Sequence, residues 1–190
     1  MEESRLRTLR RKQLLYTNLL FLVNLLIVFA LIAFQAAAPV VYTVLGLIFL
    51  IPPLSLQIMK RPNPLLFYLP GMKELFQYEM DKLGSNWRRY YTSSSILLVA
   101  LSVFFFVQAV MQDGNKLFME GMPVWYLVVI PLALIYIGNM NLRFHARRLD
   151  EKTPEQLKAY AYDKMLFSLV FASVSVVMTV LGAIVVMLMT

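Results

Sequence analysis

The sequence of 190 residues predicts an all-α, polytopic integral membrane protein with five transmembrane helices. Its composition is the first reason, because 59% of the residues are hydrophobic and only 15% are charged. Soluble domains have roughly 45–50% apolar and about 25% charged residues, and a small soluble domain leaves much of its surface in water. Five charge-free apolar stretches and a one-sided distribution of Lys and Arg are the second and third reasons.

The five expected spans form a single membrane domain that covers residues 1–190. They run over residues 14–34, 40–59, 95–111, 124–142 and 165–189. Each approaches the roughly 20 residues that cross a bilayer, and residues 90–94 would complete the third. No Asp, Glu, Lys, Arg or His lies within these spans. Because such residues mark ion and proton paths, the sequence argues against an ion pump or a proton-coupled transporter.

The basic residues predict how the chain is threaded. Of the 18 Lys and Arg residues, 17 precede the first span or lie in the loops 60–92 and 143–164, whereas Lys116 lies between the third and fourth spans. Lys and Arg collect on the cytoplasmic side of membranes. We therefore expect a multi-pass protein of the cell (cytoplasmic) membrane, with the N-terminus inside, the C-terminus outside and both long loops in the cytoplasm.

The first span has some features of a secretory signal, with a basic start and small residues at 36–38. Its apolar run is about twice the usual 7–15 residues of the apolar region within a signal peptide, and Pro39 would directly follow the cut. An uncleaved anchor is therefore expected.

Spans one and two, and spans three and four, have the sequence features of two tandem hairpins, followed by a fifth helix. Tyr16 and Tyr91 each precede a Thr near the start of a hairpin, and Pro39 and Pro123 open the second helices. A parallel repeat is known in some transporters. Membrane hairpins also converge on Pro and aromatic residues at the interface, which is the interpretation we favour.

Prolines interrupt two spans. Pro52 and Pro53 lie in the second span and Pro131 in the fourth, and each removes a backbone hydrogen bond of the helix. They are candidate hinges, or fixed bends that shape the bundle. The neutral polar residues of the spans are expected to form hydrogen bonds between helices. They are Asn24, Thr43, Ser55, Gln57, Ser102, Gln108 and Asn139.

A small-residue seam marks the fifth span, where small side chains recur at spacings of three and four. The seam consists of Ser168, Ala172, Ser175, Thr179 and Gly182. Small residues let another helix approach closely. That helix would belong either to the same chain or to a partner protein or second copy.

The two long basic loops contain structure of their own. Residues 72–83 show an amphipathic helical pattern with Gly84 as a stop, which suits the membrane surface, a partner's groove or a plain connector. Thr153, Pro154 and Gln156 form a capping pattern for a helix that continues into the fifth span.

The end of the fourth span is basic. Arg143, Arg147 and Arg148 are expected to contact anionic lipids, at about 1 kcal/mol per charge. His145 is the one His of the sequence, so a His-only metal site within one chain is excluded, and we expect a lipid-facing surface residue.

No sequence motif for catalysis, nucleotide binding or metal binding is found, and the sequence has no Cys. The threading explains the net charge of +7, so nucleic acid is not an expected partner. We expect no catalytic, cofactor-binding or metal-binding residue, and membrane lipids plus another membrane protein or a second copy as partners.

Two functions remain after these exclusions. The first is a non-catalytic membrane subunit that binds, assembles or regulates a larger membrane protein complex. The alternative is a small permease or lipid-translocating protein acting as a homo-oligomer. A lipid-headgroup enzyme is a distant third, with four candidate residues: His145, Glu79, Asp81 and Arg88.

Overall fold

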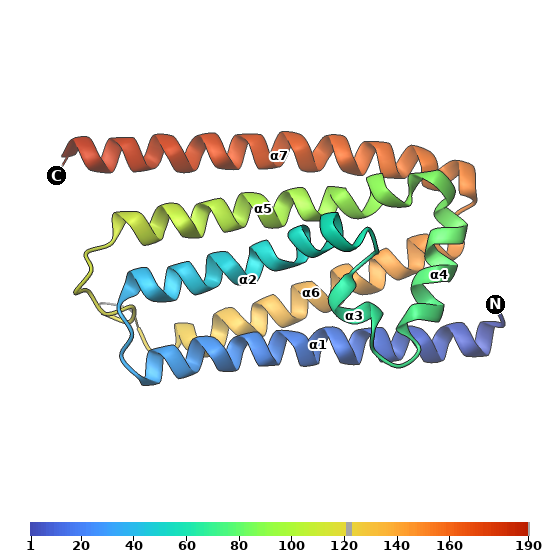
Figure 1. Cartoon of the computed structure of the whole chain (residues 1–190), viewed down its shortest axis with the longest axis horizontal. Helices are drawn as coiled ribbons and strands as arrows, with labels where there is room; N and C mark the ends of the chain where they lie inside the picture. Colours follow the sequence, from blue (N-terminus) through green and yellow to red (C-terminus); the bar gives the residue numbers. More distant parts are fainter. Residues whose placement is uncertain (121–122, 190) are drawn as a thin grey trace.

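The computed structural model describes residues 1–120 and 123–189, which form helices and loops between them (Figure 1). The helices are α1 (Glu3–Ala33), α2 (Ala38–Met59), α3 (Pro64–Phe67), α4 (Met72–Leu83), α5 (Trp87–Met111), α6 (Tyr126–Glu151) and α7 (Pro154–Met189), with a 3-10 turn η1 (Gly84–Asn86). Within these residues, five helical segments are long and apolar enough to cross a membrane, which confirms the predicted all-α polytopic fold.

The two termini lie at opposite ends of the bundle (Figure 1), as an odd number of spans requires. We call the end that holds the N-terminus, α3, α4 and the α6–α7 turn the basic end. Lys116 belongs to the connection at the other end, where its carbonyl accepts a hydrogen bond from the Ala38 amide (2.8 Å). The loop between spans one and two thus touches the loop between spans three and four.

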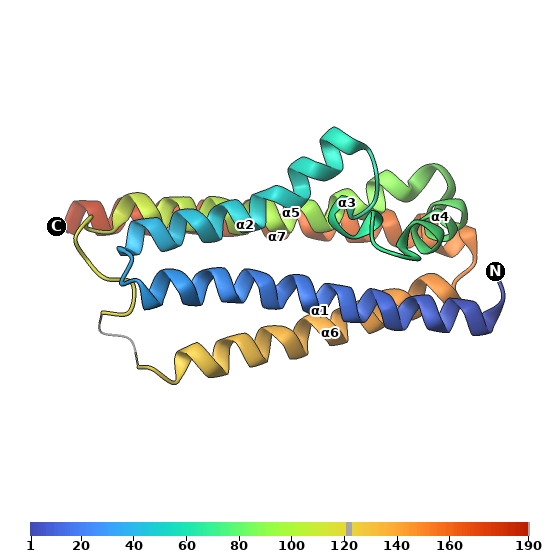
Figure 2. The same cartoon turned by 60° about the horizontal axis from the view of Figure 1, so that its bottom comes forward.

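The long helices form two layers (Figure 2). In one layer α5 lies between α2 and α7 and packs along both, whereas α1 and α6 form the other layer. The hydroxyl of Ser102 on α5 donates to the Gly46 carbonyl of α2 (2.9 Å), so the predicted hydrogen bond between spans is present for this residue. α2 follows α1, and α6 follows α5, in the order expected for two hairpins. The most extensive packing, however, joins α2 to α5 and α5 to α7.

The prolines lie inside continuous helices. Pro52 and Pro53 belong to α2, which bends in its second half (Figure 2), and Pro131 belongs to α6. The Ser55 hydroxyl donates to the Pro52 carbonyl at 2.9 Å, so it hydrogen-bonds within its own helix. The predicted bend is present in α2, and hinge motion at these prolines stays a prediction.

The small-residue seam of α7 is used largely within the chain. Ser168 and Ala172 are buried, Ser175 and Thr179 are half-buried, and Gly182 is exposed. α7 packs along α5, so small side chains allow these two helices to lie close together. Ser168 and Ala172 are therefore not free to bind a partner, and a partner at Gly182 stays a prediction.

The start of α7 confirms the predicted cap. The Thr153 amide donates to Gln156 Oε1 (3.2 Å) and the Gln156 amide donates to Thr153 Oγ1 (3.4 Å). The helix has 36 residues. At 1.5 Å per residue it is about 54 Å long, well beyond a hydrocarbon core of about 30 Å.

The amphipathic helix predicted over 72–83 is present as α4, but its apolar face is covered by the chain itself. Six residues of α1, α3 and α4 form a buried apolar cluster: Leu9, Leu66, Phe67, Met72, Leu75 and Phe76. This face is therefore not available to a membrane surface or to a partner's groove, because α1 and α3 already exclude solvent from it.

Gly71 allows the turn into α4, and replacing it with alanine should destabilise the protein. Its φ is +83°, and an added Cβ would lie 2.8 Å from Leu9 Cδ2. We expect Gly71→Ala to lower the free energy of unfolding in detergent by about 1–3 kcal/mol. Thermal unfolding monitored by circular dichroism measures the change. Gly114→Ala is the control because, chain neighbours aside, no atom of a described residue lies within 4 Å of its added Cβ, and equal midpoints for both variants would contradict the prediction.

Candidate functional site

The candidate site is a buried charge cluster at the basic end, which joins α1, α4, α5 and α6. Its centre is Arg10 of α1, flanked by Glu79 of α4 and Asp150 of α6. Glu79 lies three residues after Phe76 and seven after Met72, so it shares the apolar face of α4. When that face packs against the bundle, the carboxylate is carried in with it and becomes fully buried.

Arg10 binds both carboxylates at once. Its Nε and Nη2 donate to Asp150 Oδ2 (3.1 Å) and Oδ1 (2.7 Å), and its Nη1 donates to Gln13 Oε1 (3.0 Å) and to Glu79 Oε1. The side chain of Arg10 is 12% exposed. A guanidinium is suited to this position because its planar donors match two acceptors in fixed directions.

Two further hydrogen bonds close the charge cluster. The Tyr91 hydroxyl of α5 donates to the second oxygen of Glu79, and Lys82 Nζ donates to the Asp150 backbone carbonyl (2.7 Å). Among the described residues, every buried side-chain nitrogen and oxygen has a hydrogen-bond partner. The charged groups of the charge cluster are paired with one another or hydrogen-bonded within it. The cluster is therefore suited to fixing the positions of α1, α4, α5 and α6 relative to one another.

Burial and pairing act in opposite directions on these groups. Burial disfavours the charged form of Arg10, but the hydrogen bond to Asp150 and the charges of both carboxylates raise the pKa of the guanidinium above its ordinary value. Burial raises the pKa of Glu79, although Arg10 and the Tyr91 hydroxyl oppose the rise. Arg10 therefore favours the ionised form of Glu79 against the effect of burial.

A second cluster lies beside the charge cluster and consists of Tyr90 of α5, His145 of α6 and Lys164 of α7. We call it the aromatic cluster. The Tyr90 hydroxyl is 2.8 Å from His145 Nδ1, and their ring centroids are 4.8 Å apart. Lys164 Nζ lies 4.4 Å from the centroid of the Tyr90 ring and donates to the Ser94 hydroxyl (3.0 Å). The expectation that His145 is a lipid-facing surface residue is wrong, because Tyr90 and Tyr91 of α5 contact the imidazole and half-bury it.

The structure also predicts a pH dependence of stability from His145, which lies beyond the predicted span 124–142. Burial, followed by the positive charges of Lys164, Arg10 and Arg148, lowers the pKa of His145 to about 3. An unfolded chain protonates its imidazole below pH ~6.5, whereas the folded protein keeps it neutral. Stability from this residue is therefore complete above pH ~6.5 and is lost as the pH falls towards 3, by up to about 1.4 kcal/mol per pH unit.

Thermal unfolding in detergent at pH 7.5 and pH 5.0 tests this prediction. The midpoint of the unaltered protein should fall at the lower pH, and that of His145→Gln should fall by several degrees less. The comparison between the two proteins removes the contribution of the other titrating groups. Equal falls would show that protonation of His145 does not oppose folding.

The other residues expected at the basic end are placed as follows. Arg143 is exposed, Arg147 pairs with Glu151 (2.7 Å), and Arg148 donates to the Tyr160 hydroxyl (2.8 Å). Their contact with anionic lipids stays a prediction. Of the four enzyme candidates, His145 and Glu79 lie in the two neighbouring clusters, whereas Asp81 and Arg88 are exposed.

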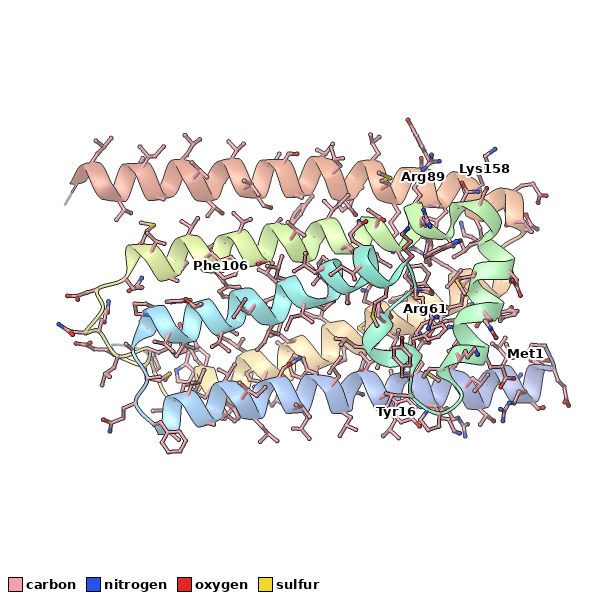
Figure 3. All side chains as sticks on the ribbon, viewed as in Figure 1. Met1, Tyr16, Arg61, Arg89, Phe106 and Lys158 are labelled. Carbon is pink, nitrogen blue, oxygen red and sulfur yellow. The ribbon has the colours of Figure 1, made fainter. Side chains whose placement is uncertain are left out.

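Charged side chains gather at the basic end (Figure 3), where Arg61, Arg89 and Lys158 are labelled.

Within residues 1–120 and 123–189, no group of three or more His, Asp or Glu side chains is arranged to hold a metal ion.

Sequence reasoning missed the charge cluster, although one signal for it was present. The spacing of Met72, Phe76, Glu79 and Leu83 puts a carboxylate in the middle of an apolar face. A charge in such a position predicts a buried partner. Nothing in the sequence indicated that the partner would be Arg10, 69 residues away.

Comparison with protein-family models, curated proteins and solved structures finds no match to this chain. The fold itself defines the class of protein, which is a multi-pass, all-α membrane protein with a buried ion-pair network at one end.

Proposed function

We propose that this protein is a non-catalytic integral membrane subunit that binds, assembles or regulates a larger membrane protein complex. The observation that carries the proposal is that α1 and α6 are largely exposed across the membrane, and that each holds an Asn whose side chain has no hydrogen-bond partner among the described residues. Asn24 lies in the middle of the first span and Asn139 near the end of the fourth.

The exposure of these two helices supports the proposal. In the most apolar stretch of each, none of the residues is buried, and Leu26 of α1 and Ile137 of α6 are 56% and 62% exposed. α2 and α5, in contrast, pack along each other. The charge cluster holds α1 and α6 at the basic end, so their membrane faces remain open to another protein.

The two Asn side chains provide the chemical preference for a protein over lipid. Neither Asn24 nor Asn139 makes a side-chain hydrogen bond to any residue of 1–120 or 123–189. Lipid tails offer no donor or acceptor, and a hydrogen bond between membrane helices contributes roughly 0.6–2 kcal/mol. A partner helix with a polar side chain at the same depth would satisfy these amides.

Affinity capture of the full chain from its native membrane in mild detergent tests the proposal. We expect a protein of different sequence in stoichiometric amount, and a loss of several-fold in its recovery with Asn24→Leu. Thr43→Val is the matched control, because the Thr43 hydroxyl already donates to the Pro39 carbonyl of its own helix (2.7 Å). Recovery of the chain alone, or equal recovery with both variants, would contradict the proposal.

A homo-oligomeric permease or lipid-translocating protein is the second candidate. The bend of α2 favours it, because Pro53 lines an open groove beside α5. A pure homodimer that loses uptake or lipid flipping with Pro52→Ala would support this candidate over the first.

We also propose that the protein lies in the cell membrane with its basic end in the cytoplasm, because 17 of its 18 Lys and Arg residues belong to that end. A periplasmic or extracellular reporter enzyme fused after Thr190 should be active, and the same enzyme fused before Met1 should be inactive. The opposite result would reverse the orientation.

A further inference from the structure

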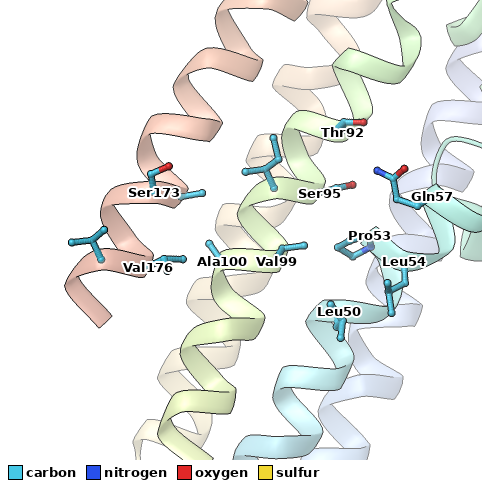
Figure 4. A pocket seen from close by; sticks show the side chains of 13 residues that line it. Leu50, Pro53, Leu54, Gln57, Thr92, Ser95, Val99, Ala100, Ser173 and Val176 are labelled. Atoms are coloured by element: carbon cyan, nitrogen blue, oxygen red, sulfur yellow. The ribbon is translucent and has the colours of Figure 1, made fainter. Parts of the chain in front are cut away.

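An open groove of about 570 Å³ runs between α2, α5 and α7 (Figure 4). Its volume lies within the range of about 300–1,000 Å³ that is typical of sites for small ligands. It belongs to neither the charge cluster nor the aromatic cluster, and the proposed subunit function does not use it.

The groove opens away from α1 and α6. Val99 of α5 lines it, whereas Tyr90 faces His145 of α6. Nine residues separate Val99 from Tyr90, which is about two and a half helical turns and puts them on opposite sides of α5. The groove therefore faces the lipid that surrounds the protein.

Two features of the sequence create the groove. Its floor carries small side chains, among them Ala100 of α5 and Ala172 and Ser173 of α7. The third wall is α2, which bends at Pro52 and Pro53 and contributes Pro53 and Leu54 to the lining. Small residues leave space beside α5, and the bent helix encloses that space on the remaining side.

The two ends of the groove differ in chemistry. Gln57, Thr92 and Ser95 lie towards the basic end, whereas Leu50 and Val99 lie deeper in the membrane (Figure 4). The side chains of Gln57 and Thr92 make no hydrogen bond to any described residue. An occupant with a polar group at one end and a hydrocarbon chain at the other matches this pattern.

Positive charge lies just beyond the polar end. Arg88 is exposed and precedes Thr92 by four residues, so it lies one turn closer to the basic end on the same side of α5. Its guanidinium lies 5.5 Å from the Trp87 ring centroid, and within the described chain it forms no ion pair. Such a cation is available to a phosphate at the membrane surface.

We propose that this groove is a binding site for one anionic glycerophospholipid of the leaflet at the basic end. The acyl chain lies along Val99, Ala100 and Pro53, the ester groups accept hydrogen bonds from Gln57 and Thr92, and the phosphate pairs with Arg88. A partner helix could also pair with Gln57 and Thr92, but the exposed cation of Arg88 just beyond them suits a phosphate at the membrane surface, which is why a lipid is the better occupant.

The acyl-chain part of the site is tested by filling the groove. Native mass spectrometry of the full chain in neutral detergent, titrated with phosphatidylglycerol, should show one lipid retained preferentially. Val99→Trp should weaken its retention at least tenfold. Leu101→Trp is the matched control, because Leu101 is 38% exposed against 39% for Val99 and lies on the opposite side of α5. Both variants must elute and unfold like the unaltered protein.

The headgroup part is tested with lipids of equal chains and different charge. The protein should prefer phosphatidylglycerol to phosphatidylcholine by about fivefold, and Arg88→Gln should abolish the preference while leaving phosphatidylcholine binding unchanged. Lys158→Gln is the control for the loss of one exposed cation. Free glycerol phosphate should not compete, because it lacks the chain.

Three results would overturn the proposal: equal retention of both lipids, unchanged retention with Val99→Trp, or conversion of a dimer to a monomer by Val99→Trp without a change in lipid. The last would make the groove an interface between helices. None of these measurements involves a partner protein, so their failure is distinct from failure of the subunit proposal.

Discussion

Replacing Arg10 with alanine should lower the free energy of unfolding by about 3–5 kcal/mol, the largest loss that we expect from one substitution. The variant leaves the carboxylate of Glu79 buried without its cation and removes both guanidinium hydrogen bonds to Asp150. A buried charge without a partner is costly because the interior solvates it poorly. Thermal or denaturant unfolding in detergent, followed by circular dichroism, measures the loss.

Arg11→Ala is the matched control, because Arg11 is the neighbouring residue and its side chain is exposed. Its effect should be below about 0.5 kcal/mol. Should Arg10→Ala fail to fold, the double variant Arg10→Met with Glu79→Met provides a second test. Replacing a buried ion pair by apolar groups is often nearly neutral, so this variant should be more stable than Arg10→Met alone. Equal effects of Arg10→Ala and Arg11→Ala would show that the charge cluster does not hold the fold.

Replacing Gly46 with leucine should cost about 1–3 kcal/mol by separating α2 from α5. A Cβ added at Gly46 would lie 2.7 Å from Cε1 of the Phe106 ring. To relieve this contact the Phe106 ring must leave its position or the two helices must separate, and separation would break the hydrogen bond from the Ser102 hydroxyl to the Gly46 carbonyl. The unfolding midpoint in detergent should fall accordingly.

Gly138→Leu is the control for this substitution, because Gly138 is also helical but, its own helix backbone aside, no atom of a described residue lies within 4 Å of its added Cβ. It should be neutral or slightly stabilising, since leucine is the better helix former by up to about 1 kcal/mol. Combining Gly46→Ala with Phe106→Leu should restore most of the stability lost with Gly46→Ala alone. A Gly46→Leu protein as stable as Gly138→Leu would show that α2 and α5 do not depend on this close approach.

The membrane helices could be predicted because their signal is local. Each span is a charge-free run of apolar residues, and lipid requires that its backbone hydrogen bonds close within the helix. The helix cap formed by Thr153 and Gln156 was equally predictable, since its hydrogen bonds join residues that are three apart in the sequence. Such interactions depend on neighbours in the sequence, and they were confirmed.

The position of α4 and the charge cluster could not be predicted in the same way. The pattern of residues 72–83 requires that an apolar face be covered, but several surfaces would satisfy the requirement. The structure covers it with Leu9 and Leu66, which brings Glu79 to Arg10. His145 was placed wrongly for a similar reason, because its partner Tyr90 is 55 residues away.

The sequence by itself determined that this is an all-α polytopic membrane protein, which segments cross the bilayer, and which end of the bundle is basic. Hydrophobicity and charge act on each segment separately, so these properties can be read one segment at a time. The tertiary structure alone decided that α5 lies between α2 and α7, that Arg10 joins Glu79 to Asp150, and that a bent α2 encloses a groove. These features depend on which helices meet, and the packing of residues far apart in the chain sets that choice.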